Sequence, residues 1–183
     1  MTPGTWLLLL AGVLLLVLLG WTLWTLTRLR RLEARVARAW TALDTQLQRR
    51  AGLAEELARN FPAAVGEERA EYLAAFARDA RAPADGDREL AENILGRELR
   101  ELPAHPPGVP AALRTDLAGT TTRVGLARRF YNDGVRDLRA LRRGRLPRLL
   151  RLHASHPLPR FFDIDDRADG VARGLDGAGN PRR

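Results

Sequence analysis

The chain opens on a long apolar run, and its first charged side chain is Arg28. The run from Thr5 to Thr27 has 23 residues and would rise about 34 Å as an α-helix, enough to cross a hydrocarbon core of roughly 30 Å. Tryptophans lie near both ends of this run, as is typical of the two membrane interfaces: Trp6, Trp21 and Trp24. The pattern therefore predicts a short flank and one transmembrane helix within residues 1–27.

A cleaved signal peptide and the core helix of a soluble protein are the other two interpretations of this run. A signal peptide has a basic leading segment, a shorter apolar stretch and a cleavage site of small residues. Residues Met1–Gly4 carry no basic side chain, and no such site follows the run. A soluble core helix is seldom so uniformly apolar, since 14 of the 18 residues Leu7–Trp24 are Leu, Val or Trp. Both alternatives therefore fit less well than a membrane anchor.

Basic residues follow the apolar run and are offset only by Glu33: Arg28, Arg30, Arg31, Arg35 and Arg38. The positive-inside rule then predicts a single-pass protein of the cell membrane with its N-terminus outside and its bulk in the cytoplasm. The same arginines would lie near anionic lipid headgroups.

Beyond Arg28 the apolar residues recur at helical spacing, and the alternating pattern of strands is absent. The first stripe steps mostly by three or four residues: Leu29, Leu32, Val36, Trp40, Leu43, Leu47, Leu53 and Leu57. It continues from the apolar run without a breaker and is expected to stop at Asn60-Phe61-Pro62. Two shorter helices are predicted after it, over about 67–81 and 87–102.

A later segment has the clearest periodicity in the chain. Its apolar and small residues step alternately by four and three: Leu113, Leu117, Thr120, Val124, Ala127, Tyr131, Gly134, Leu138 and Leu141. That 3.5-residue period is the packing seam of a helical bundle or coiled coil. We therefore predict an all-α domain over 28–162, and a polar, Gly-rich tail over 163–183 that is expected to be disordered.

Composition narrows the chemistry. The chain has no Cys, which excludes disulfides, thiol nucleophiles and iron–sulfur clusters. Its net charge is +8, and ten arginines against two acids between Arg123 and Arg151 carry all of it. This stretch supplies a candidate basic surface: Arg136, Arg139, Arg142, Arg143, Arg145, Arg148 and Arg151. An acidic protein partner or anionic lipid headgroups would suit it; nucleic acid suits it less, because no recognition motif or aromatic platform accompanies the charge.

Catalytic motifs are missing from the sequence. The only possible metal or catalytic cluster is His153 with His156, Ser155 between them and acids downstream. Pro157 follows at once, and neither the His-Glu-x-x-His pattern nor a nucleophile elbow is present. We therefore predict no enzyme, no catalytic residues, no cofactor and no metal site.

Two segments of the chain resemble the LemA family of membrane-anchored bacterial helical proteins. The first is Arg35–Arg50, RVARAWTALDTQLQRR, and the second is Leu126–Val135, LARRFYNDGV. The Phe161-Phe162 pair and the single N-terminal span fit in order. The chain departs from the family pattern at Thr121-Thr122, where a Glu-Asn pair is expected, so it resembles a divergent member. The resemblance implies an up-and-down four-helix bundle with long helices on one membrane anchor, and no established enzymatic activity.

The motif residues suggest a candidate interhelical cluster: Trp40, Asp44, Gln46, Arg50, Arg129, Tyr131 and Asn132. They would form either a binding surface or a polar network between the first and the last predicted helix, with Asp44 paired to Arg129. From these features we expect a membrane-anchored scaffold or adaptor that recognises a protein partner. The alternative is a module that binds anionic lipid or nucleic acid through its arginines. Small residues along the last helix would also suit self-association.

Overall fold

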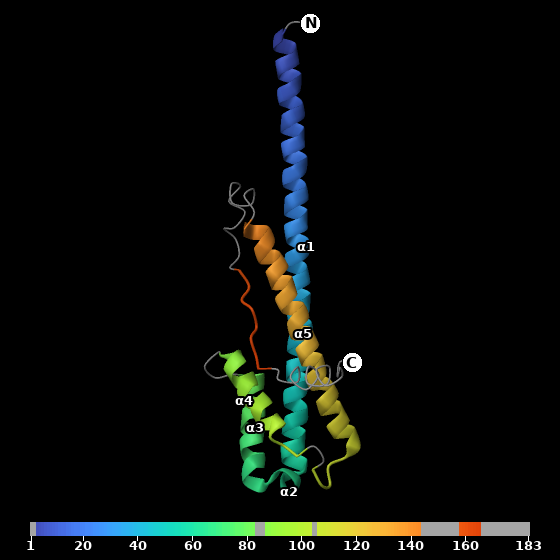
Figure 1. The fold of residues 1–183 in the computed structure, drawn as a ribbon, viewed down its shortest axis with the longest axis vertical. Helices are drawn as coiled ribbons and strands as arrows, with labels where there is room; N and C mark the ends of the chain where they lie inside the picture. The colour runs from blue at the N-terminus through green and yellow to red at the C-terminus, as the bar shows by residue number, and fades with distance from the viewer. Residues whose placement is uncertain (1–2, 83–86, 104–105, 144–157, 166–183) are drawn as a thin grey trace, which may run out of the picture. The chain divides into compact units, whose positions relative to one another are not determined.

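The computed structural model describes residues 3–82, 87–103, 106–143 and 158–165. Within these ranges the chain is all-helical and has no strand, as the sequence predicts. The helices follow one another along the chain (Figure 1): α1 (Pro3–Asn60), α2 (Pro62–Val65), α3 (Glu67–Arg81), α4 (Arg88–Arg100) and α5 (Ala111–Arg143).

Helix ends lie where the sequence places its stop and start signals. Helix α1 ends at Asn60, because Pro62 has no amide hydrogen to continue the ladder. Helix α4 starts after Asp87, whose side chain accepts a hydrogen bond from the Leu90 amide at 3.0 Å and so caps the helix. Helix α3 matches its predicted range, and the four-residue helix α2 was not predicted. Helices α1 and α5 are long, with 58 and 33 residues, whereas α3 and α4 have 15 and 13 residues.

The seam predicted for the last long helix is confirmed in α5. Six of its nine positions are buried: Leu113, Thr120, Val124, Tyr131, Gly134 and Leu138. The other three are half-buried: Leu117, Ala127 and Leu141. The 3.5-residue period therefore marks the packed face of this helix.

The chain divides into two compact units. Unit 1 consists of 1–39 and 133–160, and unit 2 of 40–132 and 161–183. Helices α1 and α5 each contribute to both units. The single domain over 28–162 stays a prediction, and the periodicity of a continuous seam carries no signal of compact units along it.

The first part of α1 is long and apolar enough to cross a membrane, and none of its most apolar 18-residue window is buried. The large apolar side chains between Trp6 and Trp24 are 54–75% exposed. At the end of this run the Arg28 guanidinium lies 5.5 Å from the centre of the Trp24 ring, a cation–π contact.

Unit 1 packs the basic end of the apolar helix against the end of α5. Gly134 permits a close approach, since a Cβ atom there would lie 3.3 Å from Cγ2 of Val36. Leu138 is buried one turn further along α5. Beyond it Arg142 is buried and donates to the Glu33 carboxylate at 2.6 Å. Small and apolar seam residues thus bring the helices together, and an ion pair fixes their register.

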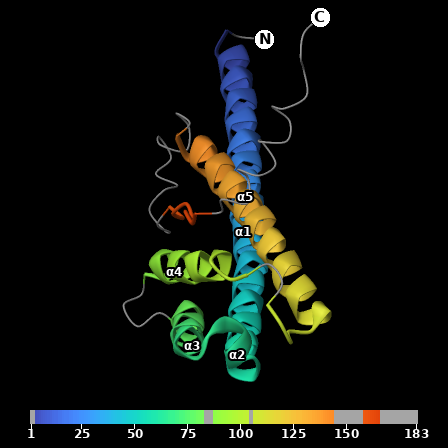
Figure 2. The same ribbon diagram turned by 60° about the horizontal axis from the view of Figure 1, so that its bottom comes forward.

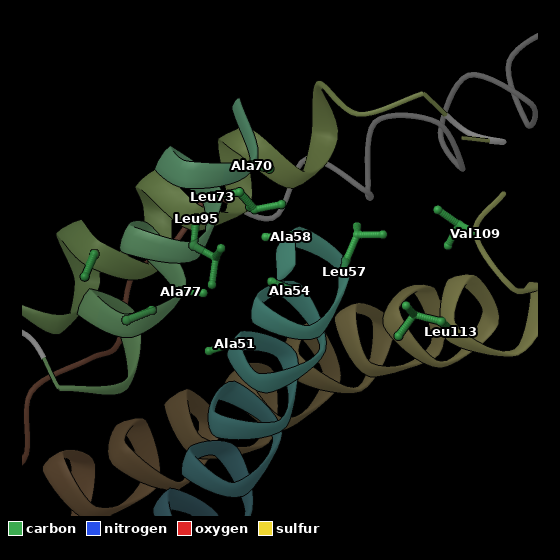
Figure 3. Packing of buried hydrophobic residues seen from close by; sticks show 12 residues of the cluster. Ala51, Ala54, Leu57, Ala58, Ala70, Leu73, Ala77, Leu95, Val109 and Leu113 are labelled. Carbon is green, nitrogen blue, oxygen red and sulfur yellow. The ribbon is translucent and has the colours of Figure 1, made fainter. Parts of the chain in front are cut away.

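Unit 2 has a core of small and branched residues contributed by α1, α3, α4 and α5. Figure 3 shows Ala51, Ala54 and Ala58 of α1 directed toward Leu73 and Leu95 of the neighbouring helices. Alanines let the helix backbones approach closely, and Figure 2 shows α3 and α4 side by side beside this part of α1. The remaining core side chains are Leu57, Ala70, Ala77, Ala80, Ala91, Val109 and Leu113.

The segment after Pro159 is extended and belongs partly to unit 2. Phe162 and Ile164 are each 4% exposed, whereas Phe161, Asp163 and Asp165 point outward. This alternation is what an extended chain with one packed face shows. Of the polar tail predicted over 163–183, residues 163–165 are described and belong to unit 2, with Ile164 buried; the rest of that tail lies outside the described residues.

Candidate functional site

Helix α1 contributes Arg50, the last residue of the motif Arg35–Arg50, to an ion pair that is buried in unit 2. Arg50 is 3% exposed, and its Nη2 atom donates to Oε2 of Glu92 at 2.6 Å. The same atom lies 3.4 Å from the Glu92 backbone oxygen. Glu92 itself is fully enclosed on α4. A buried pair of this kind is tolerated only when its geometry is good, and it fixes register more than it adds stability.

A second arginine of α4 extends this pair into a network. The Arg88 Nη1 atom lies 2.5 Å from Oδ1 of Asp44, and its Nε atom lies 3.9 Å from Oε1 of Glu92. The sequence suggests Arg129 as the partner of Asp44; the arginine found beside its carboxylate is Arg88 of α4. Arg88 and Glu92 are four residues apart on α4, so one face of that helix meets both Asp44 and Arg50 of α1.

The carboxyl of Glu92 is the titratable group that this network perturbs. Burial raises the pKa of Glu92, since the enclosed site favours the neutral acid. The guanidinium groups of Arg50 and Arg88 oppose that rise. The effect of burial on the pKa is larger than that of the two arginines. The ionised form of Glu92 is therefore disfavoured by its surroundings and depends on both arginines for stabilisation.

Three aromatic rings form a second cluster in unit 2. The Trp40 ring centre lies 5.2 Å from that of Tyr131 and 5.6 Å from that of Phe162. The Trp40–Phe162 pair is edge-to-face, with an angle of 73° between the rings. Such arrangements are favoured by the ring quadrupole. The aromatic residues of the two predicted motifs thus meet, and together they hold the extended segment.

The side chain of Asn132 pairs with the backbone of that segment. Its Nδ2 atom donates to the Phe162 carbonyl oxygen at 2.9 Å, and its Oδ1 atom accepts from the Phe162 amide at 2.9 Å. Donor and acceptor are satisfied together, as between neighbouring strands of a sheet. Both hydrogen bonds are made with backbone atoms, so they do not depend on which side chain the segment carries at this position.

Helix α4 supplies the other backbone partners of the segment. Oε1 of Glu89 accepts from the Asp163 amide at 3.0 Å, and Oδ1 of Asn93 accepts from the Asp165 amide at 2.7 Å. Arg100 donates to the Asp165 carbonyl oxygen at 2.9 Å. These residues step by four and seven along α4, so they lie on one face of the helix. That face is distinct from the one that buries Glu92.

Two arginines face the acidic side chains of the segment. The Arg100 guanidinium lies 3.6 Å from the Asp165 carboxylate, and the Arg128 guanidinium lies 3.7 Å from the Asp163 carboxylate. Both pairs are partly exposed, so each contributes only modestly. They add charge complementarity to a contact made chiefly by buried apolar side chains and backbone hydrogen bonds.

Unit 2 therefore carries two groups of contacts. The buried network consists of Asp44, Arg50, Arg88 and Glu92. The clasp holds the extended segment Phe162–Asp165 and consists of Trp40, Glu89, Asn93, Arg100, Arg128, Tyr131 and Asn132. No family model, no curated protein and no solved structure matches this chain. Its function is therefore inferred from its own side chains.

The two remaining members of the predicted cluster are Gln46 on α1 and Arg129 on α5. Gln46 is half-buried, and its Oε1 atom has no hydrogen-bond partner in the part of the chain that the structure describes. Arg129 is exposed on α5. The cluster thus divides: Asp44 and Arg50 join the network, while Trp40, Tyr131 and Asn132 join the clasp.

Several arginines of the candidate basic surface make contacts within the protein itself. Arg136 pairs with Asp133 at 2.6 Å, and Arg139 donates twice to the Pro159 carbonyl oxygen, at 3.2 and 2.8 Å. Arg142 is 7% exposed, so assigning it to an exposed surface was wrong: it follows Leu138 by one turn and is buried on the same face. Arg143 is exposed. The other three lie outside the described residues: Arg145, Arg148 and Arg151.

The histidine cluster at His153 and His156, with Ser155, also lies outside the described residues. Among the residues that are described, no group of three acids or histidines is placed to hold a metal ion.

Sequence reasoning missed the α4 side of the site. Arg88 and Glu92 follow each other at the spacing of an ordinary surface ion pair, and Glu89 and Asn93 repeat that spacing one position later. No local feature of the sequence distinguishes the buried Glu92 from Glu89 and Asn93, which bond to the extended segment. The apolar-acid alternation of Phe162–Asp165 was the one available signal for an extended, half-buried segment.

Proposed function

We propose that this protein is a membrane-anchored helical adaptor that binds a protein partner on the cytoplasmic side. The observation that carries the proposal is the continuity of α1. One helix begins with a fully exposed apolar stretch and ends inside the core of unit 2. Such a helix makes the apolar stretch and part of a folded unit one continuous element of the chain.

The arginines after the apolar run support the proposed orientation, with the N-terminus outside. We further propose that four of the helices form an up-and-down four-helix bundle: α1, α3, α4 and α5. The resemblance to the LemA family, carried by the motifs of Arg35–Arg50 and Leu126–Val135, agrees with this architecture. The assignment to that family is part of the proposal.

Photo-crosslinking in intact cells tests the adaptor function. Phe130 is 67% exposed on α5, so a photoreactive phenylalanine analogue there leaves the described core intact. We expect irradiation of the full-length chain to give a discrete adduct with another protein. The same analogue at Tyr72, 55% exposed on α3, samples a different surface of unit 2.

The matched control carries Leu10→Arg and Leu14→Arg in the anchor. It keeps both crosslinking positions but is expected to lose the adduct, because the chain no longer lies at the membrane. Adducts that consist only of lipid or nucleic acid at both positions would contradict the adaptor proposal and favour the arginine-based module.

A further inference from the structure

The clasp in unit 2 holds an extended segment in a way that depends little on covalent continuity. Residues 40–132 of unit 2 are continuous, and residues 133–160 of the other unit separate them from Phe161. The segment meets unit 2 through contacts between residues 30 to 74 positions apart. The same contacts would form with a chemically similar segment from another chain.

Three features of the clasp specify what it accepts. Buried sites take the side chains of Phe162 and Ile164, two residues apart. Backbone amides of the segment donate to Asn132, Glu89 and Asn93, and this pairing requires an extended chain. Arg128 and Arg100 face carboxylates at the two alternate positions. Backbone pairing gives affinity and alternate side chains give specificity, as in other strand-recognition sites.

We propose that this clasp is a recognition site for an extended protein segment with the pattern aromatic–acid–aliphatic–acid, which the chain's own Phe162–Asp165 occupies until a partner's segment displaces it. The proposal rests on the adaptor function and names the chemistry of its partner. Phe162–Asp165 then acts as a tethered competitor. Because this segment is covalently attached, its local concentration sets the threshold that a partner must exceed.

A synthetic peptide tests the clasp on the purified full-length chain in detergent micelles. The peptide has the sequence of residues 159–166, PRFFDIDD, with a fluorophore at its N-terminus. The chain carries Phe162→Ser and Ile164→Ser, which remove the two apolar anchors of the tethered segment. We expect saturable binding by fluorescence anisotropy, and binding about tenfold or more weaker to the wild-type chain, whose own segment competes.

Control variants locate the binding. Asn132→Ala added to the double variant removes two hydrogen bonds to the peptide backbone and is expected to weaken binding about tenfold. Thr122→Ala, at an exposed position on the same helix, is expected to leave binding unchanged. A peptide with Ser in place of both apolar anchors should not bind. A peptide with Asn for its acids should bind a few-fold more weakly and with less dependence on salt.

A double variant that keeps its helical signal and cooperative melting but binds no peptide would overturn the proposal. The segment would then be only a covalently delivered part of the fold. If the double variant unfolds, Phe162→Ser alone answers the same question, since Ile164 remains to hold the chain. Failure here leaves the crosslinking result intact, so the two proposals fail separately.

Discussion

Replacing Arg50 with methionine is expected to lower the free energy of unfolding by about 3–5 kcal/mol, the range for removing one partner of a buried ion pair. Methionine fills much of the same space, so little of this loss comes from a cavity. The loss arises because Glu92, fully enclosed, keeps its carboxylate without its closest cation. Urea unfolding followed by helical circular dichroism measures the change.

The pH dependence of this variant distinguishes a charge effect from a packing effect. A carboxyl whose pKa is raised by folding stabilises the folded state below its ordinary pKa, and that contribution is lost as pH rises through the raised value. Burial already raises the pKa of Glu92, and removing Arg50 takes away the strongest opposing interaction. The difference in free energy of unfolding between wild type and Arg50→Met should therefore become smaller as the pH is lowered from neutral.

Two controls accompany the Arg50 experiment. Arg49→Met removes the neighbouring exposed pair with Asp116, at 3.7 Å, and should change stability by less than about 1 kcal/mol. Arg50→Met combined with Glu92→Met removes both charges and should recover much of the loss. A deficit that is equal at all pH values and persists in the double variant would contradict this account of the network.

Placing Leu10→Arg and Leu14→Arg in the apolar stretch of α1 is expected to abolish membrane integration. Each arginine near the centre of a span costs about 2.5–3.5 kcal/mol on insertion scales, so two cost roughly 5–7 kcal/mol. The measurement is the fraction of the chain that resists extraction from membranes at alkaline pH. Wild type should remain in the pellet, and the variant should not.

The matched control places the same two charges on the exposed face of α3, as Glu68→Arg and Tyr72→Arg. This control chain should stay in the membrane pellet. Extraction of the wild-type chain, or equal retention of all three chains, would show that the apolar stretch is not an anchor.

The helices could be predicted from the sequence to within a few residues, because their signals are local. Apolar spacing marks α1 and α5, and Pro62 and Asp87 mark an end and a start. The division into two units could not be predicted, since one seam along α5 serves both. The small helix α2 has too few residues to show a period.

The candidate site was predicted only on the helices that carry aromatic motifs. Trp40, Tyr131 and Asn132 were singled out, and they meet at Phe162. Their partners on α4 were missed because burial of Glu92 depends on which face of a short helix turns inward. The sequence also does not specify which arginine pairs with Asp44, because the chain has 30 arginines.

The most direct test of the central claim, a single span that places the helical units in the cytoplasm, is site-specific labelling. The chain has no Cys, so Gly4→Cys and Glu68→Cys each introduce one reactive thiol. In intact cells a membrane-impermeant maleimide should label Gly4→Cys at once and Glu68→Cys only after permeabilisation. Labelling of Glu68→Cys in intact cells, with Gly4→Cys protected, would contradict the orientation on which the adaptor proposal depends.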